Sequence, residues 1–262
     1  MRAALLQLLY ITTLIACMSL LVEPHEVETN NILLIGDSLD RNLVDDLCSS
    51  RGGQKIDWSE NTFKYVFYGA TQLCIFDRGA LGSLHLFGSA ATGPYVNGEV
   101  NTTDDPHTDS ELRVWEGIRI FGKTVGELTW VVFHVSIWDI SLMDKTAITG
   151  DHTFITQYKG QLVARLEDID RCKPIKTRVA LRTGPHMEWG GNAQVSLNTV
   201  IREVAQERKL PLLDYDLVAW GLGASEAEIF KDQDHPNQRI SATFANSIVT
   251  DLSTHYRLLP DA

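Results

Sequence analysis

Three residues at opposite ends of the chain have the types required for nucleophilic catalysis. Ser38 follows a short apolar run within Asn31–Arg41, whereas Asp232 and His235 lie close together near the C-terminal end. A serine hydroxyl is a weak nucleophile until a base removes its proton, and a histidine oriented by a carboxylate is such a base. Asp232 is the expected partner of His235 rather than Asp234, because the side chains of adjacent residues usually diverge. The pattern therefore predicts a triad of Ser38, His235 and Asp232.

Each of these clusters also has a plainer interpretation. Ser38 could simply cap a helix, because Asp and Ser are favoured at that position. The segment Lys231–Asn237 reads KDQDHPN and could be a polar turn, because it is rich in turn-forming residues. It is the occurrence of both clusters, in this order, that favours catalysis over either alternative.

The segments between the two clusters alternate between strand and helix patterns. Ile32–Ile35 is apolar without alternation, which is typical of a buried parallel strand. Other strand candidates are Lys64–Tyr68, Leu73–Phe76, Leu84–Phe87, Thr129–Val135, Arg178–Leu181 and Pro211–Asp214. Helices with one apolar face are expected at Thr153–Asp170, Val195–Arg208 and Ile240–Tyr256. This alternation predicts a flavodoxin-like α/β fold, a three-layer α/β/α sandwich around a mostly parallel sheet.

Several polar segments follow strands and should meet at one rim of this sheet. In such folds ligands bind beyond the carboxyl ends of the strands. Ser38, the loop after Val135, Arg182–His186 and Asp214–Asp216 are all in that position. Gly79–Asn97 is rich in glycine and is expected to form a loop near the same rim.

Composition indicates a globular protein with an acidic surface. Hydrophobic residues make up 44% of the 262 residues and charged residues 22%, and the formal net charge is −11. An acidic surface argues against nucleic acid as a partner. The length suits one folded domain, expected at residues 31–262.

The N-terminal segment predicts entry into the secretory pathway. Met1–Val22 carries one charge, at Arg2, and is otherwise almost wholly apolar, as in a signal peptide. It is also about long enough to span a bilayer, so a cleaved signal and a membrane anchor both stay open. Residues 23–30 form a short linker. Asn101–Thr103 is an N-glycosylation sequon, and Asn101–Ser110 is expected to be an exposed polar excursion.

Cysteine and histidine usage gives no metal signature. Of four cysteines, Cys17 lies in the N-terminal segment, and Cys48, Cys74 and Cys172 remain for the folded part. One disulfide and one free thiol are compatible with these three, but the sequence does not choose the pair. The eight histidines lack ligand spacing, so we expect neither a metal nor another cofactor.

Two short motifs and two longer segments carry a resemblance to a known family. Gly36–Arg41 reads GDSLDR and Asp232–His235 reads DQDH, which resemble the GDSxxR and DxxH motifs of the PC-esterase branch of the GDSL/SGNH hydrolase superfamily. Val131–Ile140 (VVFHVSIWDI) resembles the strand of that branch that ends in a Trp-containing loop. Leu181–His186 (LRTGPH) resembles its Arg-Thr-x-Pro-x-His segment. The similarities extend from Asn31 to about Tyr256.

The resemblance implies a serine esterase or acyltransferase of the SGNH type. Its catalytic residues would be Ser38, His235 and Asp232, and its substrate a small-molecule or glycan ester, because the branch includes enzymes that move or remove O-acetyl groups on carbohydrates. Two alternatives stay open. One is an O-acetyltransferase that acts on glycans in the secretory pathway, and the other is a non-catalytic, carbohydrate-binding module on an SGNH-like scaffold.

One departure from the superfamily concerns the oxyanion hole. The superfamily uses a Gly-x-Asn-Asp segment to supply an oxyanion-hole Asn, whereas Ser136–Asp139 reads SIWD here. The backbone N–H of Ser38 would then serve, together with a glycine of the Gly79–Gly93 region, for which Gly88 is our candidate.

Four further side chains are candidates for substrate contacts. Arg41 would add positive charge near the site, or pair with Asp45 one helical turn later. Arg182 and His186 would bind substrate hydroxyls or an acyl carbonyl, or brace the loop that carries them. Trp138 would stack on a sugar ring or pack within the domain.

Overall fold

The computed structural model describes ten segments of the chain: residues 30–57, 72–86, 95–96, 99–100, 110–135, 139–140, 153–185, 191–222, 226–232 and 235–254. The strand expected at Lys64–Tyr68, the excursion at Asn101–Ser110 up to residue 109, and Met1–Val22 lie outside these segments. None of the helices within them is both long and apolar enough to cross a bilayer.

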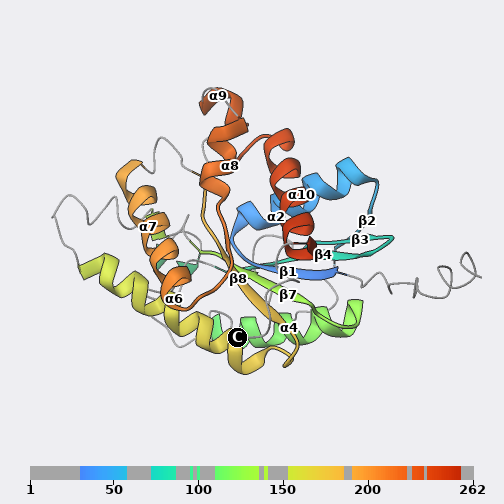
Figure 1. Ribbon diagram of the computed structural model, residues 1–262, viewed down its shortest axis with the longest axis horizontal. Coiled ribbons are helices and arrows are strands. Elements are labelled where there is room, and N and C mark those ends of the chain that lie inside the picture. Colours follow the sequence, from blue (N-terminus) through green and yellow to red (C-terminus); the bar gives the residue numbers. More distant parts are fainter. Residues whose placement is uncertain are drawn as a thin grey trace, which may run out of the picture.

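Seven strands of the described residues form one sheet in the order β2-β3-β4-β1-β7-β8-β9 (Figure 1). They are β1 (Asn30–Gly36), β2 (Gln54–Asp57), β3 (Gln72–Phe76), β4 (Gly79–His85), β7 (Trp130–Phe133), β8 (Arg178–Arg182) and β9 (Leu212–Leu213). The five strands from β4 to β9 are parallel, and β2 and β3 extend the sheet as antiparallel strands. A separate pair joins β5 (Tyr95–Val96) to β6 (Glu99–Val100).

Helices cover both faces of this sheet, which confirms the predicted three-layer sandwich (Figure 1). One face is covered by α2 (Ser38–Arg51), α8 (Tyr215–Leu222) and α10 (Gln238–Thr254). The other is covered by α4 (Ser110–Val125), α6 (Thr153–Cys172) and α7 (Gly191–Glu207). The short helix α9 (Glu226–Ile229) follows α8. Of these helices α4, α8 and α9 had not been predicted.

Strand β1 lies at the centre of the sheet and explains the unbroken apolar run that precedes Ser38. Leu33 and Ile35 pack into the core beneath α4, α6 and α7, whereas Ile32 and Leu34 pack into the core beneath α2 and α10. All four side chains are fully buried because both faces of the strand are covered. The chain places β4 on one side of β1 and then β7 on the other, so β1 ends at a topological switch point.

The loop predicted at Gly79–Asn97 is wrong for its first part. Gly79–His85 is strand β4, which pairs with β1 along its whole length, up to the pair Gly36–His85. A Cβ on Gly82 would overlap the ring of Phe121. The glycine thus serves close packing of α4 against the sheet, rather than a loop.

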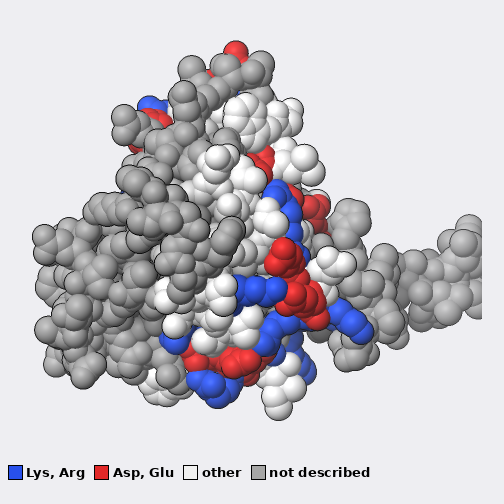
Figure 2. All heavy atoms as spheres, turned by 90° about the vertical axis from the view of Figure 1, so that its left-hand side faces the viewer, with Lys and Arg blue, Asp and Glu red and all other residues white. Residues whose placement is uncertain are grey.

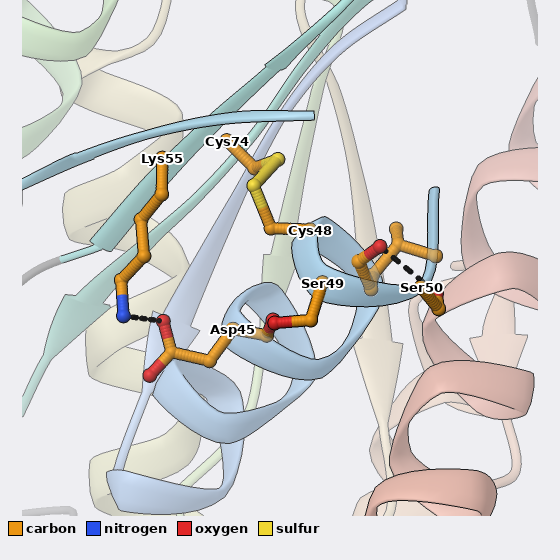
Figure 3. Close-up of a disulfide and its surroundings, with 7 residues drawn as sticks. Asp45, Cys48, Ser49, Ser50, Lys55 and Cys74 are labelled. Atoms are coloured by element: carbon orange, nitrogen blue, oxygen red, sulfur yellow. Dashed lines mark hydrogen bonds and ion pairs between the residues drawn. A yellow bond between two sulfur atoms is a disulfide. The ribbon is translucent and has the colours of Figure 1, made fainter. Parts of the chain in front are cut away.

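A disulfide fastens the antiparallel edge of the sheet to α2 (Figure 3). The sequence did not predict which two of the three cysteines pair. The structure joins Cys48 of α2 to Cys74 of β3 and leaves Cys172 as a half-buried thiol. Beside the bridge, Lys55 of β2 forms an ion pair of 2.8 Å with Asp45 of α2. Lys55 is thus the cation that the structure pairs with Asp45, for which Arg41 had been the expected partner.

Ion pairs also join α6 to α7 on the opposite side of the molecule. Lys159 contacts Glu203 and Glu207, and Arg208 contacts Glu167. Figure 2 shows acidic and basic side chains next to one another across the described part of this face. The charges there are paired, so the net acidity of the chain does not appear on it as a patch of one sign.

Candidate active site

Ser38 lies where β1 ends and α2 begins, at the first residue of the helix. The N-cap is Asp37, whose backbone is extended and whose Oδ1 accepts a hydrogen bond from Leu39 N–H at 3.0 Å. In return, Oδ2 of Asp40 accepts a bond from Asp37 N–H at 3.1 Å, which completes a capping box. The alternative that Ser38 itself caps the helix is therefore wrong, and its hydroxyl is available for another partner.

Gly36 permits the close packing of this turn. A Cβ at this position would overlap the Asp40 carboxylate and would lie 2.6 Å from the backbone oxygen of His134, which follows β7. A backbone atom cannot move aside as the end of a flexible side chain can. The glycine of the Gly-Asp-Ser motif is therefore required by the contact between the turn and the neighbouring strand.

The structure brings the three residues of the predicted triad together. His235 Nε2 lies 2.9 Å from Ser38 Oγ. The other ring nitrogen, Nδ1, lies 3.0 Å and 3.2 Å from the two carboxylate oxygens of Asp232. Oδ1 of Asp232 also accepts a bond from the backbone N–H of His235 at 2.7 Å. The predicted contacts are present, and Asp234 lies outside the described residues.

The loop that carries Asp232 and His235 is closed at its base. Phe230 and Pro236 form an antiparallel bridge, and the N–H of Lys231 donates to the carbonyl of His235 at 2.9 Å. Asn237 then closes the loop, because its N–H donates to Ile229 O at 2.7 Å. The Asn237 side chain accepts a bond from Ile240 N–H at 3.1 Å, so the same residue caps α10.

Arg182, at the end of β8, is fully buried and contacts the turn that carries Ser38. Its Nε and Nη2 lie 2.8 Å and 2.7 Å from the two oxygens of Asp40, and its Nη1 donates to Thr183 O at 2.9 Å. Burial disfavours the charged guanidinium, but the charge and hydrogen bonds of Asp40 raise the pKa of Arg182 above its ordinary value. Its side chain has no exposed surface, which disfavours the predicted contact with substrate. The bond to Thr183 fits the alternative role, bracing of the loop that carries Arg182.

His134 completes a buried cluster with the two carboxylates of the turn. Its Nδ1 lies 3.7 Å from Asp37 and 3.9 Å from Asp40. Burial, and secondarily the positive charge of Arg182, lower the pKa of His134 well below its ordinary value, so the ring is neutral. Ligand atoms of these three residues fall within 4.8 Å of one another, as a metal site requires. Arg182 already engages both oxygens of Asp40, however, and we assign no metal here.

The remaining predicted contacts are less well defined by the structure. Arg41 is half-buried on α2, one turn beyond Ser38. Gly88, Trp138 and His186 lie outside the described residues.

One backbone N–H of the turn that carries Ser38 forms no hydrogen bond with another described residue. The N–H of Leu39 is bound by Asp37 Oδ1, and those of Asp40 and Arg41 donate to Asp37 O at 3.1 Å and 3.5 Å. The N–H of Asp37 is bound by Asp40. Ser38 N–H donates no hydrogen bond to any described residue, and it stands at a helix N-terminus, where backbone donors favour negative charge.

Known structures share this arrangement of strands and helices. A GDSL-like lipase from Bacteroides thetaiotaomicron superposes with a TM-score of 0.51 at 13% identity, over 87% of this chain and 89% of that one. The chain has the fold of the GDSL hydrolases. At this identity the likeness concerns the fold alone.

Two further superpositions cover a similar share of the chain. An α/β hydrolase from the metagenome of Lake Arreo has a TM-score of 0.52 at 14% identity, over 86% of this chain and 95% of that one. An acetylxylan esterase from Geobacillus stearothermophilus has a TM-score of 0.50 at 15% identity, over 87% and 96%. No protein-family profile and no curated protein matches the sequence.

Proposed function

We propose that this chain is a serine esterase of the SGNH type that cleaves an ester through an acyl-enzyme on Ser38. The observation that carries the proposal is the continuous line of hydrogen bonds from Ser38 Oγ through His235 to Asp232. A nucleophile, a base within hydrogen-bond reach and a carboxylate that orients the base are together the requirements of nucleophilic acyl transfer.

In the first half of the reaction His235 acts as the base. Its Nε2 takes the proton of Ser38 as Oγ attacks the ester carbonyl, and Asp232 stabilises the imidazolium that forms. The carbonyl oxygen becomes an oxyanion, to which the N–H of Ser38 donates a hydrogen bond. The imidazolium then gives its proton to the departing alcohol, and the acyl group remains on Ser38.

In the second half the same residues act on an incoming hydroxyl. His235 takes a proton from water, the resulting hydroxide attacks the acyl-enzyme, and the proton returns to Ser38 Oγ as the carboxylic acid leaves. A sugar hydroxyl in place of water would make the product an ester and the protein an O-acetyltransferase.

The substrate that we propose is an O-acetyl ester on a carbohydrate, and the family is the PC-esterase branch of the superfamily. Support for the branch comes from the spacing in Gly36–Arg41 and Asp232–His235. Support for the substrate comes from that resemblance and from the shared fold with an acetylxylan esterase. Hydrolysis of 4-nitrophenyl acetate but not of the octanoate ester, and release of acetate from acetylated xylan, would support this choice.

The test of the mechanism is labelling by a fluorophosphonate, which reacts with activated serines. Wild-type protein should be labelled, and Ser38→Ala should be neither labelled nor active on 4-nitrophenyl acetate. Ser49→Ala is a matched control, because Ser49 lies exposed on the same helix and donates to Asp45 O at 2.9 Å. Equal labelling of wild type and Ser38→Ala would exclude Ser38 as the nucleophile.

We also propose that the chain enters the secretory pathway, either secreted or held by an N-terminal anchor. The proposal is supported by the apolar segment Met1–Val22 and by the sequon at Asn101. Expression in a eukaryotic secretory host should give a glycosylated product whose mass falls on treatment with a glycosidase. The variant Asn101→Gln should lack this change in mass.

A further inference from the structure

The turn beneath Ser38 contains two buried carboxylates. Asp37 and Asp40 are each about 1% exposed, and they hold each other in the reciprocal bonds of the capping box. Negative charge so close to Ser38 is unfavourable for the proposed reaction, because the attacked carbonyl acquires negative charge beside the same turn. Something must therefore offset these carboxylates for the turn to serve an oxyanion.

Arg182 is the cation that the structure pairs with this turn. It comes from β8, 142 residues after Asp40, and it engages both oxygens of the Asp40 carboxylate. Burial and the charge of Arg182 lower the pKa of His134 well below its ordinary value, which disfavours a charged ring in this role. The fork of the guanidinium also fixes the rotation of the Asp40 side chain, and hence the oxygen that accepts the N–H of Asp37.

The position of Ser38 follows from these contacts. Asp40 bonds to the residue before Ser38, and Asp37 bonds to the residue after it. A change in the Asp40 rotamer would break the first bond and release the backbone of Asp37, whose side chain makes the second, and so would shift the Oγ and the N–H of Ser38. Removing the guanidinium would therefore disturb the nucleophile without touching the substrate.

We propose that Arg182 is a positioning residue, which acts through Asp40 to hold Ser38 in place and to offset the negative charge of the turn. This proposal rests on the esterase function proposed above. It concerns a residue that has no exposed surface and that cannot touch substrate.

The test compares Arg182→Lys with Arg202→Lys. Lysine keeps the charge but loses the fork. Arg202 is the control because its Nε and Nη2 also engage both oxygens of one carboxylate, that of Asp214, each at 3.0 Å. It is more exposed than Arg182, and its further contact is with Asp216 at 3.1 Å rather than with Asp37 or Asp40. For 4-nitrophenyl acetate, Arg182→Lys should lower kcat roughly 10- to 100-fold with KM nearly unchanged, because a small displacement of a nucleophile has effects of that size. Labelling by the fluorophosphonate should slow by the same factor, and Arg202→Lys should leave both within about twofold. A wild-type kcat in Arg182→Lys would overturn the proposal.

A second variant tests whether the effect passes through Asp40. If Arg182 acts through Asp40, the double variant Arg182→Lys/Asp40→Asn should be no slower than the slower single variant, because contacting residues are not additive. Independent, multiplying losses would show that Arg182 acts by another route.

Hydrogen exchange separates this proposal from the proposed function. In Arg182→Lys the amides of residues 38–41 should exchange faster than in wild type, and in Arg202→Lys they should not. If wild type proves inactive but this difference is observed, the esterase function fails while the positioning of the turn by Arg182 stands. If wild type is active but exchange and kcat are unchanged in Arg182→Lys, the positioning proposal fails alone.

Discussion

The two halves of the candidate site differ in how firmly the protein holds them. The turn that carries Ser38 is surrounded by buried groups: Asp37, Asp40 and Arg182 are at most 1% exposed. The loop that carries the other two residues is at the surface, where the side chain of His235 is 20% and that of Asp232 is 50% exposed. The nucleophile is thus fixed by packing, whereas its base is fixed by a short loop in contact with water.

This difference predicts where each half is sensitive. A buried turn tolerates little change in volume, because the packed backbone around it cannot move aside. It tolerates little change in charge, because a buried charge that loses its partner is strongly destabilising. In the exposed loop, water screens the attraction between Asp232 and His235, so this carboxylate should matter less than a buried one.

The largest expected effect separates the members of the exposed half. His235→Ala removes the base and should lower kcat/KM roughly 1000-fold or more. The loss of kcat/KM in Asp232→Ala should be smaller than the loss in His235→Ala by a factor on the order of ten. Steady-state kinetics on 4-nitrophenyl acetate measure both. Equal losses would mean that exposure does not weaken the role of Asp232.

A single added methyl group should destabilise the protein at the buried turn that carries Ser38. Gly36→Ala places a Cβ against Asp40 and the backbone of His134, and should lower the free energy of unfolding by about 3 kcal/mol. Urea denaturation measures this. Gly122→Ala on α4 is the control, because its Cβ would meet nothing within 4 Å. The control should be stabilised by about 0.5–1 kcal/mol, since alanine is the better helix former.

Acid should also destabilise the buried half first. The pKa of His134 is lowered in the folded protein, so below the ordinary value of 6.5 the unfolded chain binds a proton that the folded protein does not. The stability that this group provides is complete above about pH 6.5 and is lost as the pH falls, with a slope of up to about 1.4 kcal/mol per pH unit.

The measurement is the free energy of unfolding in urea between pH 7 and pH 5. His134→Gln should flatten its decline in this range. An unchanged decline in His134→Gln would assign it to other groups.

The smallest expected effect concerns the base of the exposed loop. Asn237→Ala removes the cap of α10 and should lower the free energy of unfolding by about 1 kcal/mol. Asn246→Ala removes only an exposed hydrogen bond with Arg51 and should change it by less than about 0.5 kcal/mol. Thermal unfolding measures both changes in stability. Equal changes would show that the cap of α10 contributes no more to stability than an exposed hydrogen bond does.

The residues that could be predicted from the sequence are those whose chemistry is local. Ser38 directly follows a recognisable strand, and Asp232 and His235 belong to one turn, so each half forms a short motif, and the occurrence of the two motifs together favoured catalysis. The alternation of strands and helices likewise predicted the layers of the fold.

The buried support of the site could not be predicted, because it depends on contacts between distant segments. Arg182 lies at the end of a strand, where a side chain can point to solvent or into the core. No residue near it in the sequence indicates that Asp40 is its partner. Asp40 itself carries a local signal, since a capping box has an acidic residue or Gln three positions after the N-cap, although Glu or Gln is usual there rather than Asp. Strand β4 was missed except at Leu84 and His85, because its glycines indicate a loop unless the ring of Phe121 is known to lie against Gly82.

The bridge between Cys48 and Cys74 has a consequence for where the molecule is made. Both cysteines are buried. The bridge closes a loop across a sequence separation of 26, and the conformational entropy that it removes from the unfolded chain stabilises the fold by roughly 3 kcal/mol. Thiols in a reducing cytosol would not form this bond, and once folded they would be shielded from later oxidation. The intact mass of the chain from its natural source, lower by two hydrogens when the bond is present, would therefore record the compartment in which it folded.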